Sequence, residues 1–113
     1  MYAVAYRFTL LPSAIAFGAR AAQAEFIETW SGFTAFFKEE CGALGSRLHI
    51  GEDGAFYAYA QWPDKKTFDA ASDVPPTDEF TRLRVKWAEL CAPSEVLFQG
   101  DVVKDMMSDG GVT

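Results

Sequence analysis

The chain has 113 residues, of which half are hydrophobic and 15% are aromatic, and its formal net charge is −6. This composition is typical of a folded globular protein rather than a disordered segment, and the length allows one hydrophobic core. The acidic balance argues against a nucleic-acid partner, because phosphate binding requires a surplus of Lys and Arg on one face.

The first predicted element is a strand over residues 2–10, where large apolar side chains alternate with small or polar ones until Pro12. Large apolar side chains then recur at steps of three and four between residues 26 and 41, which predicts an amphipathic helix. Gly42 is placed to end that helix in a left-handed conformation. Its start is open, since Gly18 could cap it or interrupt a longer helix that begins near Ser13.

Two alternating segments, residues 44–50 and 56–62, flank a short turn that contains Gly51 and Gly54 and predict a β-hairpin. Neither face of the second segment is polar, so both faces of the sheet need cover. A chain of this length provides only one layer of helices, and a second copy of the chain is the economical source of the remaining cover. We therefore expect a homodimer.

Asp64 is a plausible N-cap for a short helix that reaches Ala71, and Thr77 for a longer helix that ends at Pro93. A last strand follows over residues 96–103. The order is strand, helix, strand, strand, helix pair, strand. It predicts an α+β fold of the ferredoxin-like, split β-α-β type, with a four-stranded antiparallel sheet and helices on one face.

We expect one domain over residues 1–107 and a flexible tail over residues 108–113. No signal peptide and no membrane-spanning segment are recognisable, so we expect no membrane partner. Cys41 and Cys91 form no disulfide framework, which favours a cytoplasmic location with reduced thiols. The two cysteines and His49 lack the short spacings of a metal site, so we expect no metal.

Four segments together resemble a known family: Tyr6-Arg7-Phe8, residues 25–30, residues 45–49, and Ala60-Gln61-Trp62. On these segments the chain resembles the antibiotic biosynthesis monooxygenase family of dimeric α+β barrels. The resemblance implies that two subunits pack their sheets face to face and exchange contacts of the last strand. It would thereby explain how the second face of the sheet is covered.

Some members of that family oxidise polyphenols with molecular oxygen and no metal or flavin, others degrade haem, and many have no known reaction. The haem-degrading branch is disfavoured, because its pocket carries an Asn, a Trp and a His, and this sequence contains no Asn. The resemblance implies a cofactor-independent monooxygenase that acts on a small aromatic or quinone-forming compound, with no cofactor. The alternative is a non-catalytic binding or stress-response protein that holds a small hydrophobic ligand in the same cavity.

A cofactor-independent oxygenase needs a water-free cavity, a base that removes a phenolic proton, and donors that hold the resulting anion. His49, the single histidine, is the candidate base. The alternative is that His49 is a half-exposed strand residue near the turn with no catalytic role. Arg7 and Arg47 are candidates to hold an anionic oxygen. They could equally form ion pairs with a neighbouring strand or across the dimer.

The remaining candidates are aromatic or amide side chains of the second hairpin strand. Tyr57, Tyr59 and Gln61 share one face of that strand, so they could converge on a bound aromatic ring or satisfy one another at an interface. Trp62, at the strand end, is the candidate pocket wall. Large aromatic residues of the helices are expected in the core, namely Trp30, Phe33, Phe36, Phe37 and Trp87.

Overall fold

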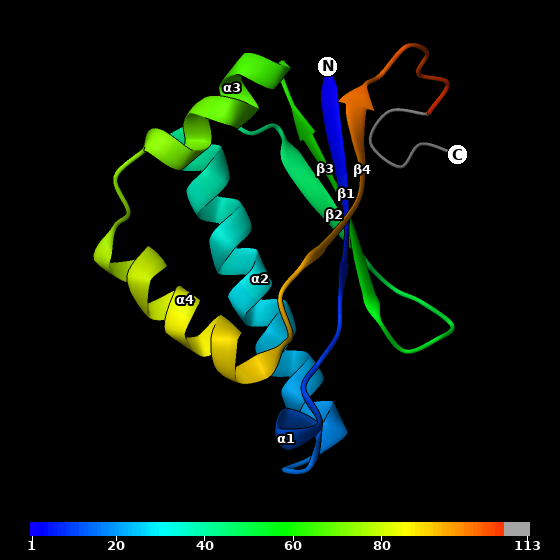
Figure 1. The fold of residues 1–113 in the computed structure, drawn as a ribbon, viewed down its shortest axis with the longest axis vertical. Helices are drawn as coiled ribbons and strands as arrows, with labels where there is room; N and C mark the ends of the chain where they lie inside the picture. The colour runs from blue at the N-terminus through cyan, green and yellow to red at the C-terminus, as the bar shows by residue number, and fades with distance from the viewer. Residues whose placement is uncertain (108–113) are drawn as a thin grey trace.

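The computed structural model describes residues 1–107 (Figure 1). The predicted flexible tail, residues 108–113, lies outside them. The elements are β1 (Tyr2–Phe8), α1 (Pro12–Ile15), α2 (Ala19–Cys41), β2 (Gly45–Ile50), β3 (Phe56–Trp62), α3 (Lys65–Ala70), η1 (Ala71–Asp73), α4 (Asp78–Leu90) and β4 (Glu95–Asp101).

The four strands form one sheet in the order β2-β3-β1-β4, and every neighbouring pair is antiparallel. Helices α2, α3 and α4 all lie on the same side of this sheet (Figure 1). The predicted α+β fold, with the ferredoxin-like split β-α-β arrangement, is therefore confirmed. No helix within residues 1–107 is both long enough and apolar enough to cross a membrane.

The structure settles where the long helix begins. A short helix, α1, starts at Pro12, where a residue without an N–H is tolerated. Gly18, at a φ of 132°, then separates it from α2. Gly42 ends α2 at a φ of 80°, the left-handed conformation expected from the sequence.

The two predicted N-caps of the second half are confirmed. The Asp64 carboxylate accepts a hydrogen bond from the Thr67 backbone N–H at 2.7 Å, which caps α3. The Thr77 hydroxyl accepts one from the Phe80 N–H at 3.1 Å, which caps α4. These side-chain oxygens serve as acceptors for backbone N–H groups that have no hydrogen-bond partner within the first turn of a helix.

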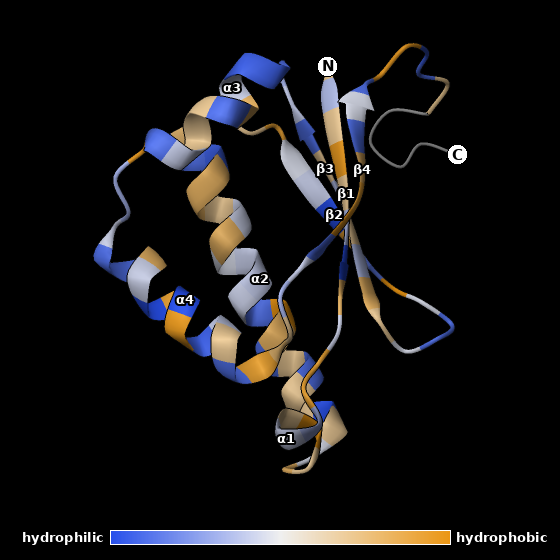
Figure 2. Ribbon diagram, viewed as in Figure 1, coloured by the Kyte–Doolittle hydropathy of each residue, from blue (hydrophilic) through white to orange (hydrophobic). Residues whose placement is uncertain are grey.

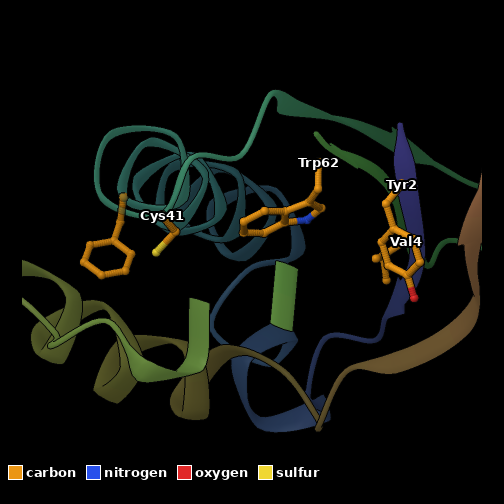
Figure 3. Close-up of a cluster of buried hydrophobic side chains, with 5 residues drawn as sticks. Tyr2, Val4, Cys41 and Trp62 are labelled. Atoms are coloured by element: carbon orange, nitrogen blue, oxygen red, sulfur yellow. The ribbon is translucent and has the colours of Figure 1, made fainter. Parts of the chain in front are cut away.

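The core lies between the sheet and the helices and is divided into two clusters. The first joins β1, the end of α2 and Trp62 of β3 (Figure 3). The second is built around Phe26, which is fully buried and stacks on Phe56 at a ring distance of 4.6 Å. Hydrophilic and hydrophobic residues alternate along α4 (Figure 2), because only one side of that helix reaches this core.

The sheet has a second face, here called the outer face, which no helix within residues 1–107 covers. Ala3 and Ala5 of β1 lie on it, yet they are only 3% and 8% exposed. Larger neighbours flank them: Tyr59 of β3 and Phe98 of β4 both pair with Ala5. Phe98 itself is 56% exposed, so apolar surface remains on this face.

Candidate ligand pocket

An apolar pocket of about 300 Å³ lies between the inner face of the sheet and the helices. We call it the aromatic pocket. All three tryptophans of the chain line it: Trp30 comes from α2, Trp62 from β3 and Trp87 from α4. Such a wall suits a flat aromatic ligand, because ring faces and edges can pack against it from several directions.

The pocket exists because small residues of the sheet lie opposite large residues of α2. Ser46 of β2 pairs with Ala60 of β3, and Ala58 lies two residues before Ala60 on the same face. Across the space, α2 contributes Trp30, Phe33 and Phe37. Helix and sheet are held apart by large side chains of the flanking core clusters, so the small sheet residues leave the space between unfilled.

Four of the residues that line this pocket carry a hydroxyl group: Tyr6, Thr34, Ser46 and Ser94. Burial, with a smaller contribution from neighbouring Tyr2, raises the pKa of the Tyr6 hydroxyl, which therefore stays protonated and can donate a hydrogen bond. The Thr34 hydroxyl donates to the Trp30 carbonyl at 3.0 Å. The Ser46 Oγ is buried and has no hydrogen-bond partner among residues 1–107.

No carboxylate, imidazole or amine is among the described residues that line the pocket. Tyr6 is its single titratable side chain, and its raised pKa makes it a poor base near neutral pH. Within residues 1–107, the pocket therefore offers donors that can stabilise an anion but no group suited to accept a proton.

No family model matches the sequence, and no curated protein matches it either. Solved structures, however, match its fold over almost the whole chain. SnoaB, a cofactor-independent oxygenase from Streptomyces nogalater, has 19% identity and a TM-score of 0.67, over 95% of this chain and 97% of that one. An antibiotic biosynthesis monooxygenase has 22% identity and a TM-score of 0.59, over 92% of this chain and 100% of the other.

The chain therefore shares its fold with these two proteins. A protein of unknown function from Nitrosomonas europaea has it too, at 13% identity and a TM-score of 0.64, over 96% of this chain and 95% of that one. At identities this low, the likeness establishes the fold and not the reaction. The resemblance predicted from the sequence is confirmed at that level.

Within this fold, the site residues predicted from the sequence separate into two groups. Trp62 lines the aromatic pocket, where it was expected, and it is 4% exposed. The other six lie on the outer face, because they alternate along their strands with the residues that face the helices. These six are Arg7, Arg47, His49, Tyr57, Tyr59 and Gln61.

The sheet separates these six residues from the aromatic pocket. His49 and Arg47 are exposed and pair in register with Tyr57 and Tyr59. A role for His49 as a base, or for the other five in substrate binding, would thus require a ligand on the outer face. Those roles stay predictions.

Arg7 is part of a polar cluster that ties the hairpin turn to β1. Its Nε donates to the Tyr57 hydroxyl at 3.2 Å, and that hydroxyl donates to the Asp53 carboxylate at 2.6 Å. Arg7 also lies 3.4 Å from Asp53 and 3.8 Å from Glu95. The Tyr57 hydrogen bond is the main cause that raises the pKa of Arg7 and lowers the pKa of Asp53. This arrangement agrees with the alternative interpretation of Arg7 as a partner in ion pairs with neighbouring strands.

Sequence reasoning assigned Trp30, Phe33, Phe37 and Trp87 to the core and did not single out Tyr6 or Ser46 as site residues. The structure places all six in the pocket wall. One signal was present in the sequence: the inward face of the hairpin carries small residues where a filled core would need large ones.

Proposed function

We propose that the protein is a cofactor-independent monooxygenase that oxidises a small aromatic or quinone-forming compound in the aromatic pocket. The observation that carries this proposal is a pocket of about 300 Å³ with a tryptophan-rich wall. A fold shared with SnoaB, described as a cofactor-independent oxygenase, supports the same reaction class. The pocket also supplies hydroxyl donors and little other polar surface, which favours an electron-rich ring over a hydrophilic metabolite.

The reaction balances without an external reductant when the substrate supplies all four electrons that reduce O₂. A ring CH₂ group loses a proton, and the resulting anion reacts with O₂ to form a C–O bond in a peroxide. The peroxide then loses water and leaves C=O, so that one oxygen atom stays in the product. The protonated Tyr6 hydroxyl is the group that would hold the anionic ring oxygen. Since no described lining residue is a suitable base, the substrate proton passes to water.

The test is oxygen uptake by the purified protein with a panel of hydroquinones and benzylic ring ketones, in the presence of a metal chelator and catalase. Ala60→Leu is the matched variant, because it fills the pocket from the sheet side. We expect uptake above autoxidation in the wild type and loss of that excess in the variant. Uptake at the autoxidation rate throughout the panel would contradict the proposal.

A second candidate is a non-catalytic protein that binds a small hydrophobic ligand in the same pocket. The observation that favours it is the lack of a carboxylate, imidazole or amine among the described lining residues. A ligand that raises the melting temperature with no oxygen uptake and no product would support this candidate.

We also propose a homodimer in which two outer faces meet. The exposed ring of Phe98 and the small Ala3 and Ala5 side chains support it, because small residues allow two sheets to approach closely. In such a dimer, the outer-face residues would lie in the interface rather than in the aromatic pocket. The cytoplasmic location stays a prediction.

A further inference from the structure

The segment that follows β3 forms one wall of the aromatic pocket. It comprises α3, η1 and Val74, residues 65–74, and we call it the α3 segment. Phe68 and Ala71 of this segment line the pocket, whereas most of the other lining residues belong to the sheet and to α2. Figure 1 shows α3 at the end of the molecule where α2 and β3 both finish. The pocket is therefore closed at this end by a short element that the sheet does not contain.

The α3 segment is only weakly buried. None of residues 63–77 is buried. The opposite wall, α2, has buried residues along most of its length, from Ala22 to Cys41. Burial of apolar side chains is what mainly resists local opening of a folded chain. This wall of the pocket is therefore held less firmly than the wall that faces it.

Within residues 1–107, no hydrogen bond ties the α3 segment to the sheet or to another helix. Its ion pair joins Lys65 to Asp69 at 2.7 Å, and the Ser72 hydroxyl donates to the Asp69 carbonyl at 3.1 Å. The cap at Asp64 is equally local. These bonds hold the segment together, and all of them would persist if it moved as a unit.

Three apolar side chains attach the α3 segment to the first core cluster: Phe68, Ala71 and Val74. The ring centre of Phe68 lies 5.5 Å from that of Tyr2 and 5.4 Å from that of Trp62. Such contacts are non-directional and individually weak. The segment can therefore leave the core and return to it without exchanging hydrogen-bond partners.

Prolines bound the segment at both ends. Pro63 precedes the cap residue Asp64, and Pro75 and Pro76 follow Val74. A proline has no backbone N–H and keeps the residue before it extended, as Val74 is at a ψ of 126°. Neither the helix nor the strand ladder continues through these positions, so a displacement of the segment can be taken up there.

We propose that the α3 segment is a lid of the aromatic pocket, which moves away as a unit to admit a ligand and closes when Phe68 returns to Tyr2 and Trp62. The proposal rests on the proposed function only in that the pocket binds a ligand, and it applies to both candidate functions. The closed lid excludes water from the pocket, which strengthens the hydrogen bond that Tyr6 can donate to an anionic oxygen.

The test measures association and dissociation rates of 2-naphthol, used as an aromatic probe, by stopped-flow fluorescence under anaerobic conditions. Loss of a wall contact mainly raises the dissociation rate. Loss of a lid contact raises the association rate as well, because the ligand enters only the open form and that form becomes more populated.

Val74→Ala is the decisive variant, because Val74 attaches the segment to the core but does not line the pocket. We expect its association rate to rise about three- to tenfold, the factor for one or two carbon groups that are no longer buried in the closed form. Phe68→Ala removes a larger contact and should raise the association rate about tenfold or more.

The control is Phe33→Leu, which shortens a pocket-lining side chain of α2. It should raise the dissociation rate and leave the association rate near that of the wild type. Wild-type association rates in both Val74→Ala and Phe68→Ala would overturn the lid and favour entry through the depression between α2 and β2, which Trp30 and Ser46 also line. An equal rise in Phe33→Leu would indicate general loosening and would also overturn the lid.

If Phe68→Ala fails to fold, Val74→Ala still decides, and hydrogen exchange of the wild type gives a second measurement. Amides of α3 should exchange through an opening of lower free energy than those of α2, and 2-naphthol should slow them. Exchange of both helices through one common opening would contradict the lid.

Oxygen uptake is scored separately from these rates. Faster association in the two lid variants without oxygen uptake would reject only the monooxygenase. Oxygen uptake with unchanged association rates would reject only the lid. Failure of 2-naphthol to bind the wild type and every variant would overturn the pocket as a ligand site, and the lid with it.

Discussion

Ala60→Leu tests whether the space between sheet and helices is open, as the structure shows it. Ala60 lies on β3 and lines the aromatic pocket. The substitution adds three carbon atoms to a side chain that points into an unfilled space. If the space is there, the larger side chain becomes buried without displacing its neighbours.

The size of the effect follows from the carbon atoms added. Burial of three carbon groups is worth at most about 2.4 kcal/mol at ~0.8 kcal/mol each. Imperfect fit in a core offsets part of that gain, since overpacking typically costs about 1–3 kcal/mol. Because a pocket of about 300 Å³ leaves room for the added atoms, the low end of that cost, about 1 kcal/mol, applies. We therefore expect a net gain in the free energy of unfolding of about 1 kcal/mol, or about 4 °C in melting temperature for a chain of this size.

Melting is followed by circular dichroism, and binding of 2-naphthol is measured in parallel. The control is Ala24→Leu, on the exposed side of α2, which should change stability by less than about 0.5 kcal/mol and leave binding intact. The expected result for Ala60→Leu is a more stable protein that no longer binds the ligand. A less stable protein, or one that binds 2-naphthol with wild-type affinity, would refute an open pocket at this position.

Three further predictions concern the thiol, the outer face and a helix cap. Burial raises the pKa of the Cys91 thiol from 9.0 to about 11, so the unfolded chain ionises first and stability should fall as pH rises from about 9 to 11. Urea titrations should show this fall reduced in Cys91→Ala, and an unchanged fall would contradict the assignment. Phe98→Glu should shift the protein to a monomer in sedimentation at micromolar concentration, whereas Phe17→Glu, which changes a phenylalanine that is 93% exposed, should not; a dimeric Phe98→Glu would argue against outer-face pairing. Thr77→Ala should lower the free energy of unfolding, measured by urea titration, by about 1 kcal/mol through loss of the α4 cap, and Thr81→Ala should not. Equal losses in the two variants would contradict a stabilising role of the Thr77 cap.

The fold could be predicted from the sequence, because the patterns that indicate its strands and helix ends involve residues close together in the chain. Strand alternation identified all four strands. In the caps at Asp64 and Thr77, the side-chain oxygen accepts a hydrogen bond from a backbone N–H only three residues further along the chain. The left-handed Gly42 is likewise a property of one helix end. The start of α2 could not be decided, because a glycine such as Gly18 is compatible with either a cap or an interruption.

The pocket was harder to predict from the sequence, because it depends on which side chains of the helices and the sheet lie opposite one another. Helical periodicity indicates that Trp30 and Phe33 point inward, but not whether the opposite strand fills the space. That requires the register that pairs Ser46 with Ala60, which involves two strands and one distant helix. Polar residues of the sheet such as His49 carry the more conspicuous chemistry, but strand alternation puts His49 on the face opposite to Ser46 and to the pocket.

The most direct test of the central claim is a ¹H-¹⁵N spectrum of the three tryptophan indole N–H groups during titration with 2-naphthol. All three tryptophans line the aromatic pocket, although they come from α2, β3 and α4. The account predicts that all three indole signals shift together and saturate at one ligand per chain. Indole signals that stay in place while signals of the outer-face residues move would contradict it.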